Sequence, residues 1–132
     1  MDRFDIHVSV PAVQDYGRQN KPAQETSASI AKRVKNCRDM QRQRYQKYSI
    51  TSNSRLDGQA LIDYATPTLE ARNLLDQAAN KFKLSMRSYN RILRVSRTVA
   101  DLNGDEVLNK AHISEALSYR QMDYKLNAKV NF

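Results

Sequence analysis

Hydrophobic side chains recur at helical spacing along most of the chain after residue 26. The clearest case is residues 71–82, where apolar positions fall at i, i+3, i+4, i+7, i+8 and i+11 and predict an amphipathic helix. The same spacing predicts further helices that start near Ser27 and cover residues 58–64, 85–103 and 110–123. Most of the chain is therefore expected to form a helical bundle.

Short polar signals mark where some of these helices begin and end. Thr66 followed by Pro67 predicts a helix start, because threonine can cap the first turn and proline suits the first helical position. Asn109 is expected to cap the last helix, and Gly104 to end the helix before it.

The helix that starts near Ser27 carries a sparser apolar stripe. Ile30, Val34 and Cys37 follow one another at i, i+4 and i+7 and are expected to face the core. Cys37 is interpreted as a buried small hydrophobe. Tyr45 and Tyr48 prolong the stripe less regularly. Beside basic residues they either pack in the bundle or stack on nucleobases, and packing is the favoured interpretation.

The beginning of the chain has a different pattern. Residues 3–11 alternate between apolar and polar positions and predict a β-strand. No comparable second strand follows, so its sheet partners are expected in upstream sequence. The expected fold is mainly α: one orphan strand and a polar linker in residues 1–26, a bundle of four to five helices in residues 27–123, and a flexible tail in residues 124–132.

Composition excludes several classes of protein. The 132 residues suit one domain, and their three glycines lie far apart, which excludes a Walker A loop and a Rossmann fingerprint. No apolar run approaches the roughly 20 residues needed to cross a bilayer. The single cysteine fits a reducing compartment. We therefore expect a cytoplasmic protein with no membrane partner.

Positive charge is concentrated in the first predicted helix. The net charge is +8, and residues 31–48 hold seven Lys or Arg against one acid. Clustered positive charge favours a polyanionic partner, but a solvated helix face is an equally good interpretation. The candidate nucleic-acid-binding residues are Lys32, Arg33, Lys35, Arg38 and Arg42.

A second group of cations lies in residues 85–103. Arg87, Arg91, Arg94 and Arg97 follow one another at steps of 4, 3 and 3 and are expected to form one row opposite the apolar side of the helix. Like charges at this spacing repel one another, so the row favours an anionic ligand. The alternative is salt bridging to neighbours such as Asp101, Glu106 or Glu115.

Other candidate sites are weaker. His7 and His112 lie far apart with no cysteine or carboxylate at ligand spacing, so no metal site is expected. Residues 101–106, DLNGDE, have their glycine fourth rather than sixth. They are interpreted as a helix-terminating turn rather than a calcium loop.

Two separated motifs resemble one known family. Residues 84–123 closely resemble the C-terminal helical region of the Mg-chelatase-like AAA+ ATPases, through RILRVSRTVADL, the preceding LSMRSYN and the following AHISEALSYRQMD. This bacterial family includes the competence-associated branch-migration helicases. The start, DRFDIHVSVP, resembles the strand that leaves the family's catalytic core. Lys110 stands where proline is common, and residues 50–63 match only loosely.

The resemblance implies roles that the residues alone only permit. Arg3 resembles an arginine finger that acts on the neighbouring subunit's nucleotide, and Arg87 resembles the sensor-2 arginine, with Arg91 and Arg94 further along the same row. The resemblance implies that ATP with Mg²⁺ is bound only by the full-length protein, whose N-terminal core is expected upstream of this chain. It further implies a homo-oligomeric ring, expected to be a hexamer, with DNA as the expected substrate of its remodelling activity. The alternative is a standalone basic helical module that binds nucleic acid or protein without ATPase activity.

Overall fold

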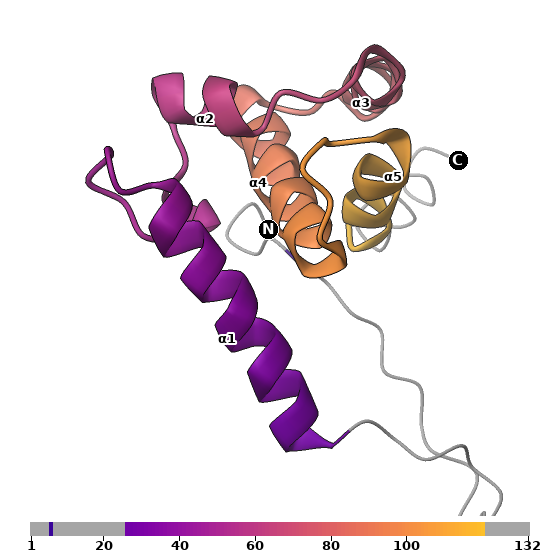
Figure 1. The fold of residues 1–132 in the computed structure, drawn as a ribbon. Helices are drawn as coiled ribbons and strands as arrows, with labels where there is room; N and C mark the ends of the chain where they lie inside the picture. Colours follow the sequence, from indigo (N-terminus) through magenta and orange to yellow (C-terminus); the bar gives the residue numbers. More distant parts are fainter. Residues whose placement is uncertain (1–5, 7–25, 121–132) are drawn as a thin grey trace, which may run out of the picture.

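The computed structural model describes Ile6 and residues 26–120, which form a bundle of five α-helices and one short 3₁₀ turn (Figure 1). The elements are α1 (Ser27–Arg44), η1 (Asn53–Arg55), α2 (Gly58–Tyr64), α3 (Leu69–Phe82), α4 (Met86–Asn103) and α5 (Lys110–Ser118). Within this part of the chain there is no strand, and Pro67 and Leu108 form an isolated bridge. The mainly α fold is confirmed. Apart from Ile6, the predicted strand lies outside the described residues, as does the tail.

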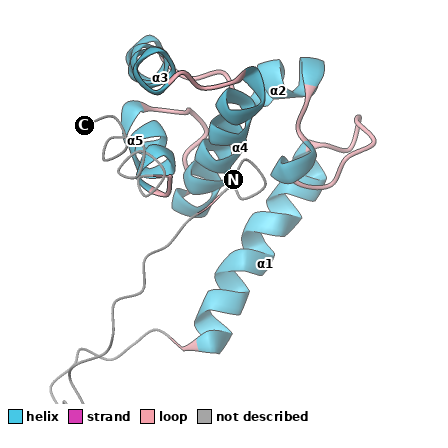
Figure 2. Ribbon diagram, turned by 180° about the vertical axis from the view of Figure 1, so that it is seen from behind, coloured by secondary structure: helices cyan, strands magenta, loops and turns pink. Residues whose placement is uncertain are grey.

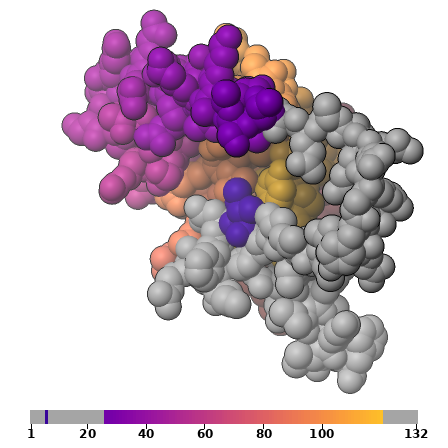
Figure 3. Space-filling model, turned by 90° about the horizontal axis from the view of Figure 1, so that it is seen from below, coloured from indigo at the N-terminus to yellow at the C-terminus, as the bar shows by residue number. Residues whose placement is uncertain are grey.

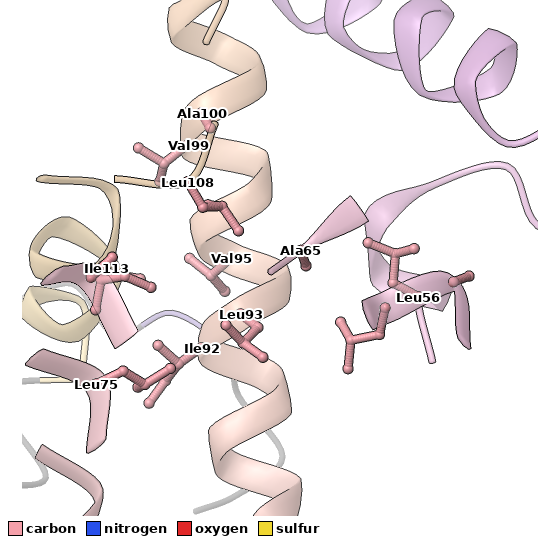
Figure 4. Close-up of a cluster of buried hydrophobic side chains, with 14 of the residues drawn as sticks. Leu56, Ala65, Leu75, Ile92, Leu93, Val95, Val99, Ala100, Leu108 and Ile113 are labelled. Carbon is pink, nitrogen blue, oxygen red and sulfur yellow. The ribbon is translucent and has the colours of Figure 1, made fainter. Parts of the chain in front are cut away.

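Helix α4 is the centre of the bundle, with α1 on one side and α3 and α5 on the other (Figure 2). Its residues from Ile92 to Asp101 are buried on nearly every side, with only Arg94 and Thr98 partly exposed. Figure 4 shows the apolar cluster along this helix. Burial of this apolar surface stabilises the domain, at about 25 cal/mol for each Å² removed from water.

Several predicted helix ends are confirmed. Ser85 caps the start of α4, where its hydroxyl accepts a hydrogen bond from the Ser88 N–H, and Gly104 ends the helix with a left-handed φ of 76°. Asn109 caps α5 as expected. His112 completes a capping box there, because its Nδ1 accepts a hydrogen bond from the Asn109 N–H at 3.0 Å. Residues 101–106 therefore form the helix-terminating turn that their sequence indicated.

The predicted start of the third helix at Thr66 and Pro67 is wrong by two residues. Helix α3 begins at Leu69 and is capped by Thr68, whose hydroxyl accepts from the Ala71 N–H. The Thr68 N–H donates to the Leu108 carbonyl at 2.9 Å. This pairing with the segment before α5 holds the backbone extended through Pro67, so α3 begins two residues later than predicted.

The predicted burial of the α1 stripe is only partly correct. Cys37 is 5% exposed, which confirms its interpretation as a buried small residue, but Ile30 and Val34 are 42% and 48% exposed. The reason is visible in Figure 1: the N-terminal half of α1 extends past the edge of the bundle. Periodicity identified the apolar face but not how far the core reaches.

Candidate nucleotide-binding and nucleic-acid-binding surfaces

Arg87 occupies the first turn of α4 and is exposed. The helix begins one residue earlier at Met86, and the Ser85 cap leaves the remaining first-turn N–H groups at the same end. The partial positive charge of a helix N-terminus adds to that of the guanidinium. This end of α4 is therefore suited to bind an anion, as the arginine row indicated.

The next two arginines of the row are half-buried rather than exposed. Arg94 donates from Nε to the Leu56 carbonyl at 2.6 Å, and its Nη2 lies 3.9 Å from a carboxylate oxygen of Asp57. Arg91 is likewise partly buried. Arg94 thus fixes the segment that enters α2 to the middle of α4, and the row becomes less accessible with each turn.

Arg97 does not belong to the exposed row, which corrects the expectation that all four arginines share a polar face. Its side chain is 4% exposed and pairs with Asp101 at 3.0 Å. It also donates to the backbone carbonyls of Tyr64, Asp105 and Glu106, at 3.3, 2.5 and 2.7 Å. For this arginine the salt-bridge alternative was right: Arg97 joins the ends of α2 and α4.

Asp101 is the centre of a buried polar cluster that connects α1, η1 and α4. Its fully buried carboxylate accepts hydrogen bonds from both Nη atoms of Arg44, at 2.6 and 2.9 Å, from Arg97, and from Asn53 at 2.8 Å. Burial opposes the charged form of Arg44, but the hydrogen bonds and charge interactions with Asp101 and Tyr45 together outweigh it and raise the pKa of the guanidinium. Arg44 was counted with the basic stretch, yet it faces inward.

Tyr45 extends the polar cluster and is completely buried, so packing rather than base stacking is confirmed for it. Its hydroxyl donates to Oδ1 of Asn53 at 2.5 Å, and burial raises its pKa. The Asn53 N–H in turn donates to Gln41 at 3.0 Å. Tyr48 packs edge-on against Tyr64, with ring centroids 5.9 Å apart. The segment between α1 and α2 thus contains a buried anchor, Asn53, that the sequence pattern did not reveal.

The basic residues of α1 form a surface separate from Arg87. The five candidate nucleic-acid-binding residues, Lys32, Arg33, Lys35, Arg38 and Arg42, are all exposed. The first three of them lie in the half of α1 that extends past the bundle, whereas Arg38 and Arg42 lie in the half that ends at Arg44, which pairs with Asp101 near the C-terminal end of α4. Arg87 lies at the N-terminal end of α4. Fourteen residues separate Arg87 from Asp101, about 21 Å at the rise of an α-helix. The two candidate surfaces are therefore not brought together.

Arg3 lies outside the described residues, so its role stays a prediction. In the described part of the chain no group of three or more His, Cys, Asp or Glu is placed to hold a metal ion. Among the same residues, no helix combines the length and apolar character that a bilayer span requires.

The sequence of the helical region matches a known family of C-terminal domains. The family model described as "Magnesium chelatase, subunit ChlI C-terminal" matches residues 24–120. The chain belongs to this family, which confirms the resemblance to the Mg-chelatase-like ATPases. The matched residues include all the described helices and the arginines of α4.

Curated relatives match nearly the whole chain. It is 38% identical to competence protein ComM of Haemophilus influenzae, over 92% of this chain and 23% of that protein. It is 31% and 30% identical to the YifB proteins of Salmonella typhimurium and Escherichia coli, over 93% of this chain and 24% of each relative. The chain thus spans about a quarter of the length of these relatives.

Proposed function

We propose that this chain is the lid of an ATP-hydrolysing AAA+ ring, in which Arg87 is the sensor-2 arginine and Arg3 the arginine finger. The observation that carries the proposal is the difference between Arg87, exposed at the start of α4, and Arg97, buried three turns later. A structural arginine is buried and saturated with protein acceptors, as Arg97 is. An arginine that binds a phosphate must remain accessible, as Arg87 does.

The chemistry of the proposed site follows from the guanidinium and the helix end. A guanidinium is always charged and donates two parallel hydrogen bonds to phosphate oxygens. The N-terminus of a helix adds N–H groups and a favourable field for an anion. Arg91 and Arg94 continue the positive potential along α4. Because Arg94 already donates to the Leu56 carbonyl, its role in phosphate binding is a supporting one. The P-loop and the Mg²⁺ of bound ATP belong to the part of the protein that this chain lacks.

We expect Arg87→Ala to lower turnover strongly in the full-length ATPase while leaving the lid folded. The exposed side chain contributes little to stability, and surface substitutions usually stay within about ±0.5 kcal/mol. Turnover falls because a phosphate ligand is lost. The measurements are steady-state ATPase rates on the full-length protein and thermal unfolding of the 132-residue chain.

Arg55→Ala is the matched control, because Arg55 is an equally exposed arginine on η1, outside the row. It should change neither turnover nor stability by a comparable amount. Full activity in Arg87→Ala, or an equal loss in both variants, would remove the basis for the sensor-2 assignment.

The proposed ring couples hydrolysis to DNA remodelling such as branch migration, and the exposed cations of α1 support a nucleic-acid contact. The second candidate function, a standalone basic module without ATPase activity, is supported by the same cations. Upstream coding sequence separates the two: a Walker A motif in frame before Met1 favours the ATPase, and an independent start signal favours the module.

The isolated 132-residue chain is expected to hydrolyse no ATP under either function, because it has no P-loop. The measurement is phosphate release by the homogeneous chain. Turnover that stays with the pure protein through stringent controls would overturn the lid assignment.

A further inference from the structure

Helix α1 carries most of its cations on a surface that the rest of the described bundle leaves exposed. Figure 3 shows α1, in indigo and violet, along one edge of the molecule. The helix contacts the bundle through Cys37 and Gln41, which are 5% and 3% exposed. Four exposed cations follow one another at steps of 3, 3 and 4 residues: Lys32, Lys35, Arg38 and Arg42. We call these four residues the α1 cation strip.

The α1 cation strip occupies one side of the helix. At about 100° per residue its four members fall within an arc of about 120°, and the buried Cys37 lies outside that arc. Arg33, the fifth candidate, lies about 100° beyond the strip, on the flank that leads to Cys37. The only acid of α1 is Asp39, which lies within the arc. The strip is therefore a positive surface about 15 Å long at the rise of an α-helix, with a single acid in it.

The strip has few partners within the domain. Among the described residues, Lys32, Lys35 and Arg38 form no hydrogen bond or ion pair. Arg42 pairs with Asp39 at 3.4 Å, and both of these side chains remain more than half exposed. Like charges three or four residues apart on a helix repel one another. The free domain thus retains a repulsion that binding of a polyanion relieves.

The shape and chemistry of the strip favour the sugar–phosphate backbone of a duplex. Proteins that bind single strands without sequence preference stack the bases on aromatic side chains, and α1 contains no aromatic residue. Tyr45, at the end of the helix, is completely buried. A straight strip of cations instead matches the regular phosphates of a stiff duplex, in which each strand has one phosphate per 3.4 Å of axis. About 15 Å of helix thus spans about four phosphates, one for each cation.

We propose that the α1 cation strip binds the phosphates of one strand of duplex DNA without regard to sequence, and that Asp39 weakens this contact by pairing with Arg42. The inference deepens the proposed function, on which it rests for DNA as the substrate. It assigns the contact to one side of α1 and leaves out Arg33, which the sequence grouped with the other cations. Phosphate contacts fix position but carry no sequence information, which suits remodelling of DNA of any sequence.

The test is binding of a labelled duplex of about 20 base pairs by the 132-residue chain, measured by fluorescence anisotropy between about 50 and 200 mM salt. About three to four phosphate contacts give a slope of log K against log salt near −3, so the affinity falls about 10²-fold over this range. Lys35→Gln should make the slope shallower by about 0.9, whereas Asp39→Asn should make it steeper and the binding tighter. Arg33→Gln is the matched control, because it removes the same charge from the same helix outside the strip, and it should leave the slope unchanged.

Other outcomes of the same measurements overturn the proposal. An equal change of slope in Arg33→Gln and Lys35→Gln means that only net charge matters. Tighter binding of a single strand of the same length indicates base stacking, and displacement of the duplex by polyglutamate as effectively as by unlabelled duplex indicates an acidic protein partner. No binding at the lowest salt removes the contact altogether. Failure of the proposed function is separately visible, because these measurements use no ATP, and Arg87→Ala then leaves turnover unchanged whether or not the strip binds DNA.

Discussion

Asp101→Ala is expected to destabilise the domain by about 3–5 kcal/mol, the usual cost of removing one partner from a buried ion pair. Asp101 is fully buried and neutralises Arg44 and Arg97, which remain in the interior when the carboxylate is removed. The same substitution leaves the Asn53 amide without one of its acceptors. Urea unfolding of the 132-residue chain measures the loss.

Two further variants identify the cause of that loss. Asp101→Asn keeps the shape and one acceptor oxygen but removes the charge, so its cost should lie between those of wild type and Asp101→Ala. Asp39→Ala removes the carboxylate of an exposed pair, 3.4 Å from Arg42, and should cost less than about 1 kcal/mol. A small effect of Asp101→Ala, similar to that of Asp39→Ala, would show that the buried cluster contributes little to stability.

Arg3→Ala is expected to reduce ATP turnover of the full-length ring by about 10³ or more, the range seen for arginine fingers. Such a residue stabilises the charge that develops on the transferred phosphoryl group at the neighbouring subunit's site. Nucleotide binding should be affected much less than turnover. The measurement is the hydrolysis rate together with the affinity for a non-hydrolysable ATP analogue.

Mixed rings separate the proposed roles of Arg3 and Arg87. An Arg3→Ala subunit combined with a subunit whose P-loop is inactive should regain activity, because an intact finger then meets an intact P-loop at mixed interfaces. An Arg87→Ala subunit combined with the same partner should not, because sensor 2 acts on the nucleotide of its own subunit. Equal rescue of both variants would contradict this division of roles.

Local signals in the sequence were sufficient for most of the helices. The 3.6-residue period of α4 and the special backbone of Gly104 depend only on neighbouring residues, so both could be predicted. The Asn109 cap is local in the same sense. The start of α3 was predicted two residues too early at Pro67. Pro67 pairs with Leu108, which lies 41 residues further along the chain, so a prediction from neighbouring residues could not include that contact.

The candidate sites were less predictable, because burial depends on which elements surround a helix. Periodicity placed Arg87 and Arg97 on one face but could not show that the carbonyls of the turn after α4 close over Arg97. The Asp101 cluster was also missed, since Arg44 and Asp101 are 57 residues apart. One signal was available: Asp101 is the only acid in α4 and lies at i+4 from Arg97, a spacing at which an ion pair forms.

The Asp101 cluster fixes α1, η1 and α4 to one another at the C-terminal end of α4. Arg87 lies at the other end of the same helix, about 21 Å away at the rise of an α-helix. A tilt of α4 by about 10° about the Asp101 end would carry Arg87 through about 4 Å, more than a hydrogen bond tolerates. The packing of η1 and α5 against α4 therefore sets the position of Arg87 as well as the stability of the domain.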